Sequence, residues 1–220
     1  MASLINSKGW KIYLALILLS ALFTFADKVF FFTDSFYYNS LAGQYELYRI
    51  REALELLRKW EWVIYAVIPF TILTRVFYTS AFLYIGVFFT QLKISFAKLF
   101  KITLLADFVY ILAAAARLIV FLFFRDISGI EDVAVKPFSV LDLLDNQAID
   151  PLFIAPLRLL NIFELLYFLV LAMLLIPVLH EFNPGEKLSY AKSLSLVAAS
   201  YGSGLLLWTV FVMFFTLTST

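Results

Sequence analysis

Long apolar runs separated by short polar stretches dominate this sequence. A helix that crosses the hydrocarbon core of a bilayer needs about 20 mostly apolar residues. The pattern predicts an all-α, polytopic membrane helix bundle with about five transmembrane helices, forming a single integral membrane domain over residues 1–220. The predicted spans are residues 12–32, 62–89, 102–124, 159–179 and 194–217.

The first two predicted spans carry irregular features. In the first, Asp27 and Lys28 interrupt the apolar run, and residues 24–26 resemble a signal-peptidase site. The run resumes at Val29, which favours a retained span over a cleaved leader. The second span is longer than a bilayer requires and contains Pro69, so it is expected to tilt, kink or protrude.

A shorter amphipathic helix is expected over residues 44–60. Its apolar residues recur every three or four positions, which places them on one helical face with charged residues elsewhere. Such a helix either lies at the bilayer interface or presents a docking face to a partner protein. The contact residues would be Leu47, Ile50, Leu54, Leu57 and Trp60.

Composition narrows the possible functions. Hydrophobic residues make up 63% of the chain and charged residues 15%, against about 45–50% and about 25% in soluble domains. The net charge of +1 gives no reason to expect a nucleic-acid partner. The chain has no cysteine and one histidine, His180, so we expect no thiol chemistry, metal site or cofactor. The lipid bilayer is the expected environment.

The distribution of basic residues predicts an orientation. Lysines cluster before the first span and in the connections between spans two and three and between spans four and five, whereas the connection between spans three and four is acidic. This alternation places the N-terminus in the cytoplasm, although Arg49, Arg51, Arg58 and Lys59 do not follow it. The basic residues are Lys8, Lys11, Lys93, Lys98, Lys101, Lys187 and Lys192, and the acidic ones are Asp126, Glu131, Asp132, Asp142, Asp145 and Asp150.

Polar side chains within the spans are the candidate functional residues, because an isolated charge in lipid costs several kcal/mol. They form either intramembrane ion pairs or a proton or ion path. Arg75, near the middle of its span, should meet a carboxylate, and either Arg75 or Lys192 is expected to reach Asp107. Arg117 and Glu164 are expected to pair between the third and fourth spans. The full set is Arg75, Asp107, Arg117, Arg158, Asn161 and Glu164.

The stretch RLLNIFELLYF, residues 158–168, contains three of these candidates. Arg158, Asn161 and Glu164 are three residues apart, so they are predicted to lie along one stripe of the fourth helix. We expect Arg158 to reach lipid headgroups and Asn161 to hydrogen-bond to a neighbouring helix. In the fifth span, Ser200 and Gly204 form a small-xxx-small pattern that predicts close helix packing.

Two regions resemble the Yip (Rab/Ypt-interacting protein) domain family. Residues 91–112, QLKISFAKLFKITLLADFVYIL, resemble the polar, Ser-Phe and basic approach to the family's third span. Residues 156–175, PLRLLNIFELLYFLVLAMLL, with residues 186–201, EKLSYAKSLSLVAASY, resemble its fourth span and the short loop into its fifth. The similarity covers most of residues 60–217.

The resemblance implies a multi-span scaffold or membrane-organising protein without catalytic residues. Bacterial members are closest in size, which implies the bacterial inner membrane. Eukaryotic members carry a long cytoplasmic N-terminal region, whereas fewer than a dozen residues precede the first span here. This difference counts against a Rab-type GTPase partner.

Three functions are therefore considered. The preferred one is a non-enzymatic scaffold or accessory subunit of a larger membrane protein complex, with membrane protein partners or self-association. The alternative is a small transporter or channel using Arg75, Asp107, Arg117 and Glu164. A membrane-embedded lipid enzyme is the third, and its only local acid–base pair would be His180 with Glu181.

Overall fold

The computed structural model describes residues 8–43, 45–124, 129, 132–133, 137–144, 149–182 and 189–219. Within these ranges, five helical segments are long and apolar enough to cross a membrane, which confirms the all-α bundle expected of an integral membrane protein. They are Gly9–Phe30, Leu47–Phe89, Phe96–Phe123, Ile162–Glu181 and Tyr190–Thr218. Four residues used to predict the orientation lie outside the described ranges: Asp126, Glu131, Asp145 and Lys187.

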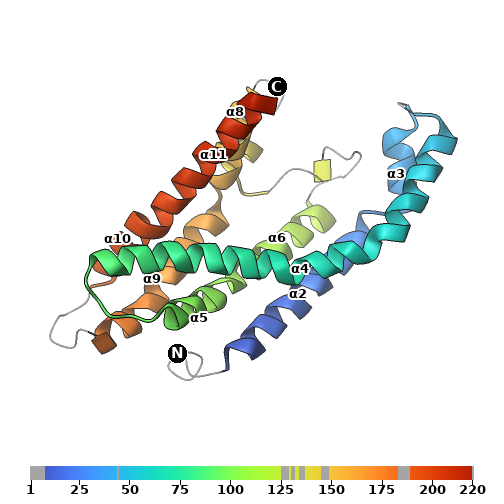
Figure 1. The fold of residues 1–220 in the computed structure, drawn as a ribbon. Coiled ribbons are helices and arrows are strands. Elements are labelled where there is room, and N and C mark those ends of the chain that lie inside the picture. The colour runs from blue at the N-terminus through green and yellow to red at the C-terminus, as the bar shows by residue number, and fades with distance from the viewer. Residues whose placement is uncertain are drawn as a thin grey trace.

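Successive spans run in alternating directions along the bundle (Figure 1). We call one end, where α4 connects to α5, the α5 end. The opposite end, which carries α3, α8 and the C-terminus, is the α8 end. The elements are α2 (Gly9–Phe30), α3 (Asp34–Leu41), α4 (Leu47–Phe89), α5 (Phe96–Ala106), α6 (Phe108–Phe123), a 3-10 helix (Val140–Leu143), α8 (Pro151–Leu159), α9 (Ile162–Phe182), α10 (Tyr190–Val197), a π-helical turn (Ala198–Gly202) and α11 (Ser203–Ser219).

Helix α4 joins two elements that the sequence predicts as separate. The amphipathic segment and the second span form one helix of 43 residues, about 65 Å long at 1.5 Å per residue. The helix continues past Trp60, where the predicted amphipathic segment ends. It also continues through Pro69, because transmembrane helices tolerate proline where neighbouring groups satisfy the backbone. A bilayer is only about 40–45 Å thick with its headgroups. We call residues 47–61 the α4 extension.

The short helix α3 packs against the α4 extension (Figure 1). Ile50 and Leu54 are buried, with exposed fractions of 2% and 8%, whereas Leu47, Leu57 and Trp60 are more than half exposed. The five predicted contact residues therefore do not share one environment. Two of its residues are buried within the chain, and three remain available to a partner.

The fourth span begins later than predicted, which breaks the expected stripe. Arg158 belongs to α8, and the chain leaves the helical conformation at Leu160 (φ −71°, ψ 83°). Asn161 then starts α9, because its Oδ1 accepts a hydrogen bond from the Phe163 amide at 2.8 Å. Its Nδ2 donates to the carbonyl oxygen of Pro137 at 3.5 Å rather than to a neighbouring spanning helix. The prediction of one stripe with Glu164 is wrong.

Helix α4 packs very closely against the π-helical turn and the start of α11. A Cβ added to Gly86 would overlap with the Cβ of Ser200, and one added to Gly204 would lie 2.7 Å from the Phe82 ring. The hydroxyl of Tyr78 donates to the carbonyl of Gly204 at 2.6 Å. Close packing at the small residues of the fifth span is confirmed.

Gly86→Ala is expected to lower the free energy of unfolding by about 1–3 kcal/mol, because the added methyl group overpacks this contact. By helix propensity alone, replacing glycine with alanine would raise the stability of the helix by about 1 kcal/mol. A measured loss of unfolding free energy must therefore come from the tertiary contact. Gly9→Ala is the control, since nothing lies within 4 Å of its added Cβ. SDS titration in detergent micelles measures both variants. Equal stability of Gly86→Ala and wild type would contradict the packing.

Candidate functional site

A bidentate ion pair lies at the centre of the bundle. Arg75 donates from Nε to Oδ1 of Asp107 at 2.9 Å and from Nη2 to Oδ2 at 2.5 Å. The Asp107 side chain is fully buried. The guanidinium carbon of Arg75 also lies 4.0 Å from the ring centroid of Tyr110. The expected pairing of Arg75 with Asp107 is confirmed, and this two-bond geometry is the strongest form of such a contact.

The backbone hydrogen bonding changes at Asp107. Asp107 lies between α5 and α6, where its amide bonds to Thr103 and its carbonyl accepts from the Tyr110 amide, both at 3.0 Å. The second bond spans three residues, so the helix tightens locally at this position. The predicted third span is therefore two helices that meet at its buried charge.

Glu164 binds tyrosines rather than an arginine. Its Oε2 accepts from the hydroxyl of Tyr110 at 3.0 Å, and its Oε1 accepts from that of Tyr201 at 2.6 Å. Tyr201 belongs to the π-helical turn of the fifth span. The ring of Tyr167 packs 4.9 Å from Tyr110 and 5.4 Å from Tyr201, between centroids. These tyrosines link α6, α9 and the fifth span.

Arg117 is directed towards α2 instead of α9. Its Nη2 lies 3.6 Å from Oδ2 of Asp27, and its guanidinium carbon lies 5.2 Å from the Phe121 ring centroid. The predicted pair with Glu164 is wrong, because α2 packs along α6 and supplies the carboxylate. Asp27 was recognised in the sequence only as an interruption of the first span.

A cavity of about 210 Å³ lies between α6, α8 and the start of α9. Four of the predicted polar residues line it: Arg117, Arg158, Asn161 and Glu164. The Nε atoms of both arginines are buried and have no hydrogen-bond partner within the described part of the chain. The structure thus gathers these residues around one space, separate from the Arg75–Asp107 pair.

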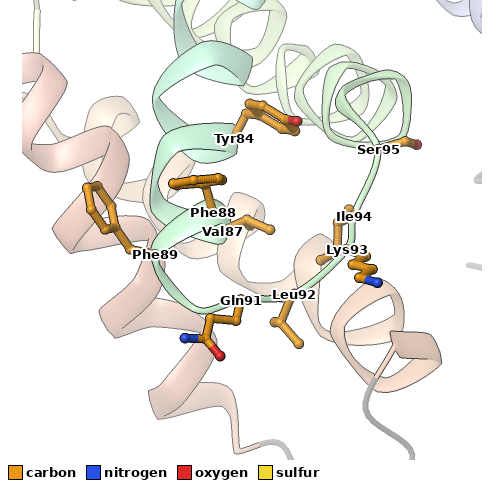
Figure 2. A pocket seen from close by; sticks show the side chains of 9 residues that line it. All are labelled: Tyr84, Val87, Phe88, Phe89, Gln91, Leu92, Lys93, Ile94 and Ser95. Atoms are coloured by element: carbon orange, nitrogen blue, oxygen red, sulfur yellow. The ribbon is translucent and has the colours of Figure 1, made fainter.

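The α5 end carries a larger, open depression of about 650 Å³ (Figure 2). Figure 2 shows aromatic side chains from the last turns of α4, including Tyr84 and Phe88, beside the connection to α5. Lys93 is the one charged residue of its lining. This mixture of aromatic rings and a lysine is typical of a membrane interface.

The candidate acid–base pair His180 and Glu181 lies at the end of α9. Glu181, the neighbour of His180, forms an ion pair with Lys98 at 2.7 Å. Among the described residues there is no group of three or more histidine, aspartate or glutamate side chains suited to holding a metal ion. Glu181 is therefore engaged by a lysine rather than paired with His180.

Sequence reasoning missed the three tyrosines of the core. Tyrosine in a membrane sequence usually indicates an interfacial position, but buried phenols also need hydrogen-bond partners. The placement of Tyr201 within the small-residue stretch AASYGSG was the available signal, because close packing there buries the ring. Tyr110 and Tyr167 offered no comparable signal.

Asp107→Asn is expected to lower the free energy of unfolding by about 3–5 kcal/mol, because it leaves the Arg75 charge without its buried partner. The double variant Arg75→Met with Asp107→Asn should recover part of that loss, since no unpaired charge remains. Glu55→Gln is the control: it removes a carboxylate from the exposed Arg51–Glu55 pair and should leave stability unchanged. SDS titration measures all three, and an additive double variant would contradict the coupling.

The chain matches no protein-family profile, no curated protein sequence and no solved structure.

Proposed function

We propose that the protein is a non-enzymatic integral membrane scaffold or accessory subunit of a larger membrane protein complex. The α4 extension carries this proposal. It continues a spanning helix beyond the length that a bilayer requires and exposes Leu47, Leu57 and Trp60. Large apolar residues exposed beside charged ones are typical of a helical docking face.

Ion pairs join the α4 extension to its neighbouring helices. Arg58 of α4 pairs with Asp34 of α3, and Lys28 of α2 pairs with Glu61 of α4. The hydroxyl of Thr33 caps α3 by accepting from the Phe36 amide. A helix held in this way loses little conformational freedom when a partner binds, which favours affinity.

The core charges favour a structural role over the transporter alternative. Arg75, whose side chain is one third exposed, and the fully buried Asp107 are joined by two hydrogen bonds. Arg117 lies beside Asp27, and Glu164 is held by two tyrosines. An ion path needs groups that exchange partners, whereas a bidentate buried pair stabilises one arrangement of the helices.

A partner is expected to co-purify with the wild-type protein from native membranes in mild detergent and to be lost in Leu57→Glu. Leu57 is 56% exposed on the α4 extension, so a carboxylate there disrupts docking without disturbing the core. Leu143→Glu, at an 85% exposed site outside the extension, is the matched control and should retain the partner. Quantitative mass spectrometry of the purified species measures stoichiometry. A solitary wild-type protein, or equal retention by Leu57→Glu, would contradict the proposal.

We also propose that the N-terminus and the α5 end face the cytoplasm of a bacterial inner membrane. The chain has no native cysteine, so Lys93→Cys and Leu143→Cys each provide one thiol, at the α5 end and in the α6–α8 connection. In intact cells, a membrane-impermeant maleimide should label Leu143→Cys and reach Lys93→Cys only after permeabilisation. Labelling of both thiols from one side would refute this orientation.

A further inference from the structure

Charged groups of both signs border the cavity at the α8 end without pairing with one another. Arg158 and Glu164 both line it, yet neither forms an ion pair with any described residue. The two tyrosine hydroxyls that bind Glu164 are neutral, so they orient its carboxylate and leave its charge unbalanced. The site therefore presents an unpaired cation and an unpaired anion to the same space.

One buried donor of each arginine, the Nε atom of Arg117 and that of Arg158, lacks an acceptor among the described residues. Arg117 lies 3.6 Å from Asp27, which is longer than a hydrogen bond. Unsatisfied buried donors are rare in native proteins and are costly when they are charged. Two such donors bordering one cavity favour an anionic acceptor in that space.

Small side chains and a break between two helices leave space for the cavity. Ala113 and Ala114 line it one turn before Arg117, where longer side chains would fill the space. Asn161 begins α9 after the break at Leu160, so Arg158 and Glu164 extend from different helices. Both charged side chains thus line one volume of about 210 Å³ without forming an ion pair with each other.

We propose that this cavity binds a phosphoethanolamine group. The phosphate would lie against Arg117 and Arg158, because guanidinium groups match the spacing of phosphate oxygens. The ammonium would donate to Glu164, whose carboxylate the tyrosines hold in place. Glu164 is in the first turn of a spanning helix, and the ends of such helices are where lipid headgroups are expected. The ligand is either a phosphatidylethanolamine headgroup or the free glycerophospho-compound, and the site does not depend on the scaffold function.

The first test compares lipids on the wild-type protein. Native mass spectrometry of the purified protein with equal amounts of phosphatidylethanolamine, phosphatidylglycerol and phosphatidylcholine measures the retained lipid. Phosphatidylethanolamine should be preferred about tenfold or more, because the other two lack an N–H donor for Glu164 and lose a charged hydrogen bond. Equal retention of the three lipids would overturn the proposal.

Variants then test which residue binds the phosphate of the headgroup and which binds its ammonium. Arg158→Gln should weaken retention of all three lipids, whereas Glu164→Gln should abolish only the preference for phosphatidylethanolamine. Arg51→Gln, an exposed arginine on the α4 extension, is the control and should behave as wild type. Unchanged retention by Arg158→Gln, or an unchanged preference in Glu164→Gln, would overturn the assignment. If Arg158→Gln does not fold, Arg158→Lys replaces it and should weaken retention by losing the two-donor contact.

Calorimetry distinguishes the two sources of the ligand. Glycerophosphoethanolamine is titrated into the detergent-solubilised protein and compared with a short-chain phosphatidylethanolamine. Binding of the lipid alone identifies a headgroup site, and equal binding of both identifies a site for the free compound. Each result supports the phosphoethanolamine site. Binding of neither would overturn it.

Discussion

The bundle depends on the need to neutralise Arg75 within the membrane. An arginine within a spanning helix is stabilised when a carboxylate meets it with good geometry, and the buried Asp107 does so with two hydrogen bonds. The pair joins α4 to the third span at a fixed register, at the residue where that span divides into α5 and α6. A one-residue shift of either helix would rotate its charge out of the contact by about 100°. The register of the two helices and the neutralisation of Arg75 therefore depend on each other.

Tyr110 contacts both the Arg75–Asp107 pair and Glu164. Its ring lies under Arg75, and its hydroxyl reaches Glu164. Tyr201 reaches the same carboxylate from the fifth span, whose backbone widens there into a π-helical turn. Such turns often occur at functional positions. Here the turn also allows the close contact between Ser200 and Gly86, so tight packing and polar bonding occur on the same segment.

The two ends of the molecule suit different contacts. At the α5 end, aromatic residues and Lys93 surround an open depression (Figure 2), and Lys98 pairs with Glu181. At the α8 end, the chain forms the α4 extension and a cavity bordered by unpaired charges. A docking surface together with a headgroup-sized site would let a scaffold hold a partner and a lipid at the same side of the bilayer. The two proposals remain independent of each other.

The sequence by itself determined the five spans, the apolar face at Leu47 and Leu57, the close packing at Ser200 and the need to pair Arg75. These features follow from local periodicity and from the cost of charge in lipid, which act on any helix of this composition. Tertiary structure alone decided that Arg117 lies beside Asp27, that tyrosines bind Glu164 and that α4 is continuous. The physical reason is that a partner depends on which helices are neighbours and how they are rotated. Helix continuity and caps likewise depend on contacts from distant segments, as at Asn161.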